Sequence, residues 1–296
     1  MKQFPRASIW ERRASLATRV LRLLRLVVHL VQVRLSVAWF LPRSARQARR
    51  DRAMSSAARL LDIFDVRLVV TGTAPARGDA ALIVANHISW LDVQALGAVT
   101  GARFVAKSEV RRWPIVGKIA ERQGTLFIKR GSCRGAWRAK NSVATALRDG
   151  DAVAVFPEGT TPDGRRVQPF RAALLEAAVE CKTPVYPVTI RYQTVSGSGN
   201  EAAAFVGDMT FASSLLRVAR EPVMAVELHF GRPIPARNRT RRELAALAQL
   251  TITETLALAA DDSLRAALRS ASVPRARVTR SLGRSAWPPT QAPAAA

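Results

Sequence analysis

The sequence predicts an α/β domain in which helices flank a largely parallel central sheet, with an amphipathic helix ahead of that domain. Short runs rich in β-branched residues alternate with helix-like patterns through the middle of the chain, as strand–helix–strand units do. Apolar residues make up 48% of the 296 residues, which is enough for a packed core. Three histidines and no C-x-x-C pair leave a zinc site without its usual ligands, so we expect no metal.

The positive charge lies mainly at the two ends of the chain. The formal net charge is +24. Residues 1–53 hold 13 Lys or Arg against 2 acidic residues, and residues 263–296 hold six Arg and no acidic residue. Basic ends favour a polyanionic partner, either nucleic acid or an anionic membrane surface. Nucleic acid is the weaker alternative, because aromatic residues are only 6% and no RNP, KH or zinc-finger pattern is present.

The N-terminal segment predicts an amphipathic helix over residues 15–41, which contain no Gly or Pro. An apolar stripe recurs every three or four residues, at Val20, Leu24, Val27, Val28, Val31, Leu35 and Trp39. The other side is mainly polar, with Arg19, Arg22, Arg25, His29, Gln32 and Arg34. The uncharged runs 26–33 and 35–42 fall short of the roughly 20 residues of a span, so we expect a monotopic helix in the headgroup layer. Two alternatives stay open: a single span with snorkelling arginines, and a helix that packs its stripe on the domain.

Composition divides the chain into three parts. Residues 1–53 form the basic membrane-binding segment with an Arg-rich hinge over 42–53, residues 54–270 form the α/β domain, and residues 271–296, with four prolines, form a disordered tail. The expected strands are 67–70, 81–85, 103–106, 125–128, 152–156, 185–190 and 225–230. The expected helices are 92–99, 134–148, 170–181 and 240–269.

Polar motifs follow several of these strands directly. They place Asn86, His87 and Asp92 after the second strand, Lys107 after the third, Lys129, Arg130 and Gly131 after the fourth, and Pro157, Glu158, Gly159 and Thr160 after the fifth. Parallel strands share one edge for their carboxyl ends, and open α/β sheets bind ligands there. We therefore expect a base, a cationic group and a carboxylate–glycine turn to converge at that edge.

The residue types at this edge point to proton transfer near an anionic ligand. The imidazole of His87 suits removal of a proton from an alcohol near neutral pH, and Asp92 would fix its tautomer. The sequence has no G-x-S-x-G elbow, which favours direct attack by a substrate hydroxyl over an acyl-enzyme. Arg130 offers a planar fork for phosphate, and Lys107 adds a second positive charge.

In these motifs the chain resembles the glycerolipid acyltransferase family, whose best-known members are the 1-acylglycerol-3-phosphate acyltransferases. NHISWLD is similar to the family's NHx4D block, FIKRG to its basic second block, and FPEGTT to its FPEGTR-type third block. VYPVTI, with Pro184 and Pro187, is similar to the apolar-proline fourth block. The resemblance covers roughly residues 60–235, and the four blocks together are specific for the family.

The resemblance implies transfer of a fatty acyl group from acyl-CoA or acyl-carrier protein to 1-acyl-sn-glycerol-3-phosphate, giving phosphatidic acid for phospholipid biosynthesis. By motif, it implies that His87 is the general base with Asp92 as its partner, and that Arg130 binds the acceptor phosphate. It further implies that Glu158 and Gly159 help to form the acceptor site. We place Lys107 and Thr160 in the same site, and we expect it to be supported by Asn86, Lys129, Gly131 and Pro157. Neither a metal nor a cofactor is expected. The expected location is the cytoplasmic face of the inner membrane.

One departure keeps a second acceptor open. Thr161 stands where many members of the family have Arg, so a lysolipid with another head group, such as lyso-ornithine lipid, is the alternative acceptor. A non-catalytic lipid-binding scaffold is a further alternative, against which the intact NHx4D block argues.

Overall fold

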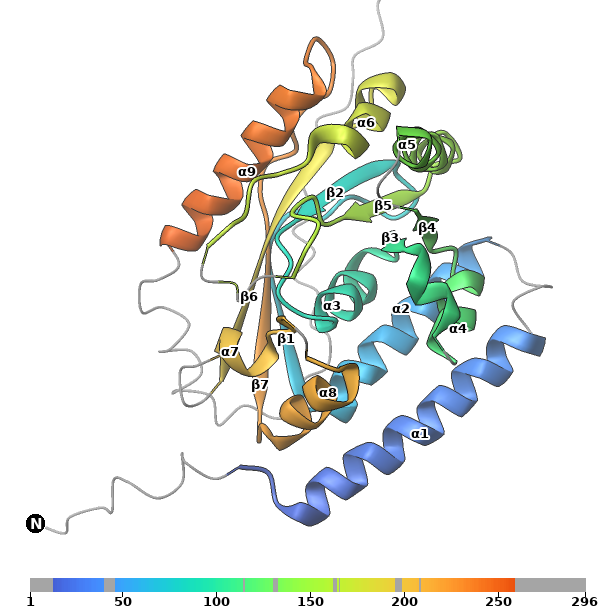
Figure 1. The fold of residues 1–296 in the computed structure, drawn as a ribbon, viewed down its shortest axis with the longest axis vertical. Helices are drawn as coiled ribbons and strands as arrows, with labels where there is room; N and C mark the ends of the chain where they lie inside the picture. Colours follow the sequence, from blue (N-terminus) through green and yellow to red (C-terminus); the bar gives the residue numbers. More distant parts are fainter. Residues whose placement is uncertain are drawn as a thin grey trace, which may run out of the picture.

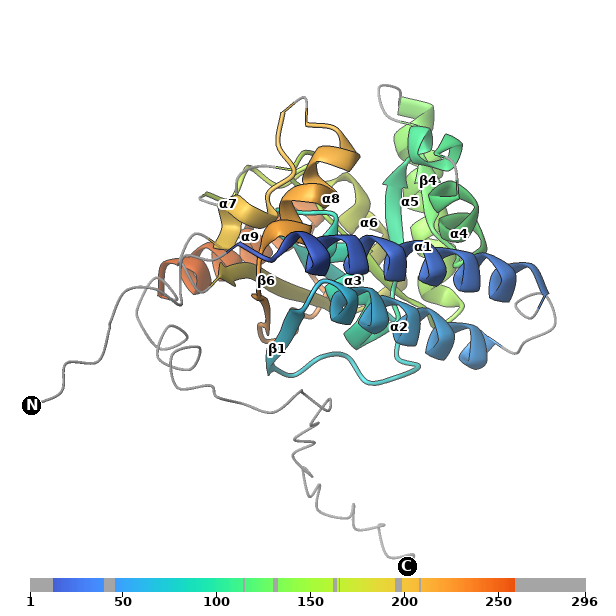
Figure 2. The same cartoon turned by 90° about the horizontal axis from the view of Figure 1, so that it is seen from below.

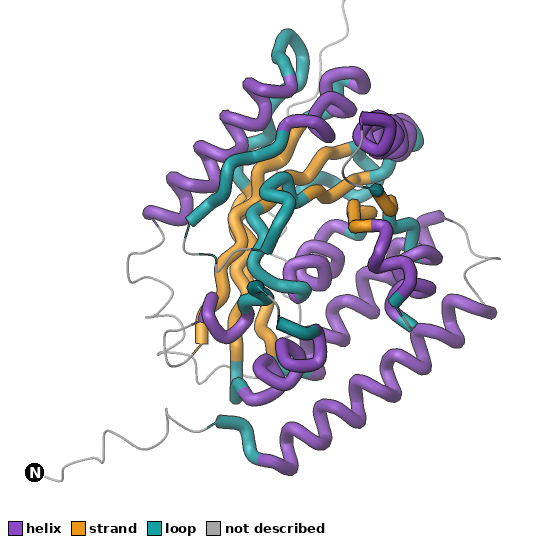
Figure 3. Tube along the Cα trace, viewed as in Figure 1, coloured by secondary structure: helices purple, strands orange, loops and turns teal. Residues whose placement is uncertain are grey.

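The computed structural model describes residues 13–39, 46–113, 115–129, 133–161, 164, 166–194, 199–207 and 209–258. A seven-stranded sheet forms its centre (Figures 1 and 3). The strands are β1 (Val66–Gly72), β2 (Ala81–Ala85), β3 (Arg103–Lys107), β4 (Leu126–Ile128), β5 (Ala152–Val155), β6 (Val185–Thr194) and β7 (Met224–Phe230). All seven predicted strands are therefore present. β6 runs four residues past its predicted end because it pairs with β7 along that length.

The sheet is largely parallel, as predicted. The strand order is β1-β7-β6-β2-β5-β3-β4, and every neighbouring pair is parallel except β6 and β7. The four strands that carry the polar motifs, β2, β5, β3 and β4, are consecutive and point the same way. Their carboxyl ends therefore lie along one edge, which positions the site.

Helices cover both faces of the sheet (Figure 1). They are α1 (Leu16–Trp39), α2 (Arg46–Ile63), α3 (Leu91–Thr100), α4 (Val116–Arg122), α5 (Cys133–Arg148), α6 (Glu176–Cys181), α7 (Gly199–Ala203), α8 (Phe211–Arg220) and α9 (Arg241–Leu258), with 3-10 turns at Ser108–Arg112 and Ala172–Leu175. Strand β2 is fully buried between the two helical layers. Its alternate side chains point to opposite faces of the sheet and so contact different helices. Ile83 and Ala85 pack with α2, α3 and α8, whereas Leu82 and Val84 pack with α5, α6 and α9.

The predicted hinge over 42–53 is wrong for residues 46–53, which belong to α2. The second half of α2 buries Met54, Ala57, Leu60, Leu61 and Ile63, and its first half is held by Arg50, which pairs with Asp151. These tertiary contacts outweigh the polar, Arg-rich composition on which the hinge prediction rested. Residues 42–45, the end of the helix predicted to 269, and the tail 271–296 lie outside the described residues.

Helix α1 runs along the outside of the molecule beside α2 (Figures 1 and 2). Its apolar stripe points to solvent, with exposed side chains at Val20, Leu24, Val27, Val28, Val31 and Leu35. Its inner side carries Leu26, Arg22 and His29, all buried against the domain. The alternative in which the stripe packs on the domain is therefore wrong. Among the described residues, no helix is long and apolar enough to cross a membrane.

Arg22 explains how a mainly polar side can face inward. Its guanidinium donates to the carbonyl oxygens of Ala219 (3.0 Å), Glu221 (2.6 Å) and Pro222 (2.8 Å), at the end of α8, and to Asp65 Oδ2 (2.6 Å). A cation at a helix C-terminus is favourable, and these acceptors compensate the loss of hydration. Arg22 thus fixes which side of α1 faces the domain.

Candidate active site

His87 lies directly after the carboxyl end of β2. The preceding residue, Asn86, is buried, and its side chain exchanges two hydrogen bonds with the backbone of Ile190 on β6. Nδ2 donates to the carbonyl oxygen (3.0 Å), and the backbone N–H donates to Oδ1 (2.8 Å). These bonds continue the β2–β6 pairing one residue past the strand, so the start of the His87 loop has a fixed position.

Asp92 lies in the first turn of α3 and is fully buried. Its Oδ2 is 2.7 Å from His87 Nδ1 and also accepts the backbone N–H groups of Ile88 (2.7 Å) and Ser89 (2.9 Å). Its Oδ1 accepts the hydroxyl of Tyr192 (2.6 Å). A carboxylate that accepts from this many donors is charged, so we assign the proton on His87 to Nδ1. That tautomer leaves Nε2 with a lone pair.

Tyr192 is the residue of this network that the sequence did not reveal. It lies on β6 beyond the predicted strand end, 100 residues from Asp92 in the sequence. Burial raises the pKa of its hydroxyl well above the ordinary value, and the nearby charge of Asp92 raises it further. The hydroxyl therefore stays protonated and donates to the carboxylate.

The imidazole ring of His87 stacks on the ring of Phe156, with centroids 4.0 Å apart and planes 16° from parallel. The His87 side chain is 20% exposed and lines a large cavity. Among the described residues, Nε2 has no hydrogen-bond partner, whereas Nδ1 is held by Asp92. The stacked and paired ring thus has one nitrogen available to a ligand.

Glu158 anchors the backbone of the site. It is 4% exposed, and its two oxygens accept backbone N–H groups, Oε1 from His87 (2.7 Å) and Oε2 from Gln168 (2.9 Å). Burial raises its pKa, while these two hydrogen bonds oppose the shift. Glu158 itself does not line the cavity, but Gly159, Thr160 and Thr161 do. Its observed contacts are therefore those of a positioning group.

The structure describes two of the three basic residues that were predicted for the site. Lys107, at the end of β3, is exposed and lines the same cavity as His87. Lys129 follows β4 and is exposed at the same sheet edge. Arg130 and Gly131 lie outside the described residues.

The Pro157 carbonyl accepts the backbone N–H of Arg171 at 3.0 Å, which closes the turn after β5.

The cavity beside His87 has a volume of about 990 Å³ and runs between the sheet edge and helices α1, α2, α3 and α4. Its walls include Leu30, Val33, Val93, Phe104 and Ile119. At the amino ends of β3 and β5 it reaches Arg50 and Arg103, which share Asp151. A mainly apolar cavity of this size suits a ligand as large as a lipid.

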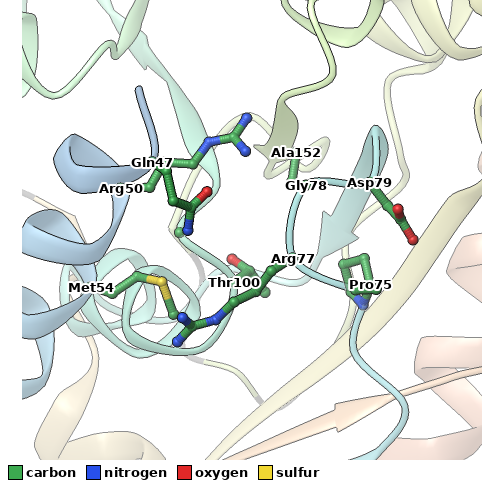
Figure 4. Close-up of a pocket in the computed structure, with 11 residues that line it drawn as sticks. Gln47, Arg50, Met54, Pro75, Arg77, Gly78, Asp79, Thr100 and Ala152 are labelled. Carbon is green, nitrogen blue, oxygen red and sulfur yellow. The ribbon is translucent and has the colours of Figure 1, made fainter. Parts of the chain in front are cut away.

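A second, much smaller pocket of about 10 Å³ lies at the amino ends of β2 and β5 (Figure 4). Its walls include Arg50, Arg77, Asp79 and Thr100. Arg50 and Gly101 line both this pocket and the far end of the large cavity, whereas His87 lies at the opposite ends of these strands and lines only the large cavity.

This chain is similar to known acyltransferases. A family model described as Acyltransferase matches residues 67–191. A lyso-ornithine lipid O-acyltransferase of Pseudomonas aeruginosa is 40% identical over 190 residues, which are 64% of this chain and 71% of that relative. A 1-acyl-sn-glycerol-3-phosphate acyltransferase of Neisseria meningitidis is 32% identical over 222 residues, which are 74% of this chain and 85% of that relative.

Among solved structures, the fold is similar to the crystal structure of the 1-acyl-sn-glycerophosphate (LPA) acyltransferase PlsC from Thermotoga maritima. The TM-score is 0.63 at 20% sequence identity, and the match covers 83% of this chain and 95% of that chain. At this identity the likeness shows the fold, with its mostly parallel seven-stranded sheet. None of these similarities supports the nucleic-acid-binding alternative.

Proposed function

Since the chain belongs to the acyltransferase family, as its motif blocks predict, we propose that it moves a fatty acyl group from acyl-CoA or acyl-carrier protein to 1-acyl-sn-glycerol-3-phosphate. The product is phosphatidic acid. The single observation that carries the reaction type is the His87–Asp92 pair at the wall of a cavity of lipid size. The acceptor is supported by the Neisseria relative, which is named for this activity.

In the proposed mechanism, Nε2 of His87 removes the proton of the acceptor hydroxyl as its oxygen attacks the thioester carbonyl carbon. Asp92 keeps the ring in the required tautomer and stabilises the imidazolium. The tetrahedral intermediate then collapses, the carbon–sulfur bond breaks, and the thiolate takes the proton back from His87. The leaving thiol has a pKa of about 8.5, so the thiolate departs readily. Protein groups and the thioester suffice, and no metal or cofactor takes part.

The cavity is the proposed place for the fatty chains. Apolar residues of α1, α3 and α4 line it, so an acyl chain inside it is shielded from water. Lys107 and Arg130 are the proposed phosphate ligands. Gly159 and Thr160 form the wall on the acceptor side, and Asn86, Pro157 and Glu158 hold that wall in place.

We place the enzyme on an anionic membrane surface, at the cytoplasmic face of the inner membrane. The support is the outward apolar stripe of α1, with exposed Arg25 and Arg34 beside it. Such a helix suits the headgroup layer, where each Arg near anionic lipid contributes about 1 kcal/mol. Leu26, Leu30 and Val33 of the same helix line the cavity, so the site would open beside the bilayer that holds its lipid substrates.

Lyso-ornithine lipid is the second candidate acceptor. The P. aeruginosa relative, which is named for this activity, is 40% identical to the chain. Thr161 lines the cavity without a charge, so the described part of the third block offers phosphate no cation of its own.

An acyl-transfer assay tests the proposal. The purified full chain in mixed micelles receives oleoyl-CoA, or the oleoyl carrier protein, together with lysophosphatidic acid or lyso-ornithine lipid. Phosphatidic acid as the main product is the expected result. Product only from lyso-ornithine lipid overturns the proposed acceptor, and no product from either lipid with either donor contradicts the reaction itself.

A further inference from the structure

The turn after β5 contains an arginine that approaches it from further along the chain. A Cβ atom built on Gly159 would lie 3.3 Å from both Nε and the guanidinium carbon of Arg171. Gly159 also has φ +72, a conformation that favours glycine. The guanidinium therefore lies directly against a turn whose residues Gly159, Thr160 and Thr161 line the cavity.

Two hydrogen bonds hold Arg171 beside this turn. Its own backbone N–H donates to the Pro157 carbonyl (3.0 Å), and the N–H of Gln168 donates to Glu158 Oε2 (2.9 Å). The other oxygen of Glu158 accepts the backbone N–H of His87. The buried carboxylate of Glu158 thus links the backbone of His87 to the segment that carries Arg171. This link fixes the distance between His87 and that segment.

The charge of Arg171 is not neutralised within the part of the chain that the structure describes. Its side chain is exposed and has no hydrogen bond or ion pair there. Other arginines of the domain do have carboxylate partners, such as Arg103 with Asp151 (3.0 Å) and Arg241 with Glu176 (3.4 Å). A guanidinium with free donors beside a turn that lines the cavity can form paired hydrogen bonds with a phosphate or a carboxylate.

We propose that Arg171 binds the anionic head group of the lysolipid acceptor and supplies the positive charge that Thr161 does not. This inference rests on the proposed function, because it assigns a residue to the acceptor of that reaction. The shared chemistry is an anionic oxygen pair, which lysophosphatidic acid offers as phosphate and lyso-ornithine lipid as carboxylate.

The test measures acceptor binding without donor, so that it does not depend on turnover. Wild-type protein and Arg171→Gln are titrated with lysophosphatidic acid, with lyso-ornithine lipid, and with an uncharged monoacylglycerol. Arg237→Gln is the matched control, because exposed Arg237 follows Ile234, which pairs with the amino end of β6, at the opposite edge of the sheet from His87.

We expect Arg171→Gln to raise the Kd for an anionic lysolipid about tenfold or more, and to leave the Kd for monoacylglycerol unchanged. The anionic lysolipid whose Kd rises identifies the head group that Arg171 binds. Adding Thr161→Arg to Arg171→Gln should restore much of the binding, because it returns a guanidinium to the same turn.

Three results would overturn the assignment. The first is an equal Kd of Arg171→Gln and Arg237→Gln for the anionic lysolipids, and the second is an equal rise in the Kd for monoacylglycerol. The third is a Kd for the anionic lysolipid that Thr161→Arg does not lower again. Failure of the proposed function gives a different pattern, in which wild-type protein acylates neither lysolipid while the binding measurements still report on Arg171.

Discussion

Asp92 is fully buried, and its charge is compensated by hydrogen bonds from His87, two backbone N–H groups and Tyr192. A buried carboxylate with fewer donors would be costly and would tend to take up a proton. A protonated Asp92 could not hold the Nδ1–H tautomer of His87. The orientation of the base therefore depends on groups that never touch a substrate, and Tyr192 is the most distant of them in sequence.

Replacing Tyr192 with Phe should test this dependence. The change removes the donor to Asp92 Oδ1 and leaves a buried acceptor unpaired, so we expect the free energy of unfolding to fall by about 1–3 kcal/mol. Urea unfolding measures it, and kcat should fall as well. Tyr186→Phe on the same strand is the control, because the Tyr186 hydroxyl has no hydrogen bond among the described residues. Equal effects of the two changes would refute the assigned role.

Helix α1 combines an attachment to the domain with an unpartnered apolar face. Arg22 and Leu26 are buried against the domain, whereas the stripe from Val20 to Leu35 is exposed. Periodicity in the sequence defines two sides of a helix but does not say which side packs. Here the carbonyl groups at the end of α8 and the carboxylate of Asp65 make the arginine side the inner one.

The exposed stripe should be the membrane contact. Leu24→Glu with Val28→Glu places two charges on that face, so we expect binding to anionic vesicles to fall at least tenfold in a co-sedimentation assay. Gln32→Glu adds a charge at an exposed polar position of the same helix and should reduce binding much less. Unchanged sedimentation of the double variant would exclude α1 as the anchor.

The attachment of α1 should weaken in mild acid. His29 packs against α2, where its Nε2 is 3.2 Å from Ser56 Oγ. Burial, and then the charge of Arg59, lower its pKa below the ordinary 6.5. Because the unfolded chain takes up this proton more readily than the folded one, stability falls as the pH drops below 6.5 toward the lowered pKa.

The pH dependence of stability that we assign to His29 is checked by the free energies of unfolding of wild type and His29→Gln, measured between pH 7.5 and pH 5. The glutamine has an amide that can replace the bond to Ser56 and does not titrate, so the stability of the variant should fall less steeply with acid. Identical pH dependence of the two proteins would show that His29 does not contribute.

At the scale of the whole molecule, the parallel sheet assembles the site. The motifs after β2, β3 and β5 span more than 70 residues of the sequence, yet His87, Lys107 and Thr160 line one cavity. This convergence was predictable, because buried β-branched runs mark the strands and parallel strands share an edge for their carboxyl ends. The central strand β2 was predicted with its observed bounds from its run of five apolar residues, and all five are buried in the structure.

Other parts of the site could not be predicted, for physical reasons. Tyr192 reaches Asp92 only because β6 lies beside β2, a pairing that no local pattern specifies. Phe156 was predicted as the end of a strand, and its stacking on His87 depends on the register of β2 and β5. Arg171 is an exposed arginine in a sequence rich in arginine, and only the close approach to Gly159 distinguishes it.

The kcat of His87→Ala in the mixed-micelle assay tests whether His87 is the base of the acyl transfer. If it is, kcat should fall by about 10²–10⁴-fold, with acceptor binding and the unfolding midpoint close to those of wild type. His229→Ala is the matched control, because His229 lies on β7 and does not line the cavity. A kcat for His87→Ala equal to that of wild type would show that His87 is not the base.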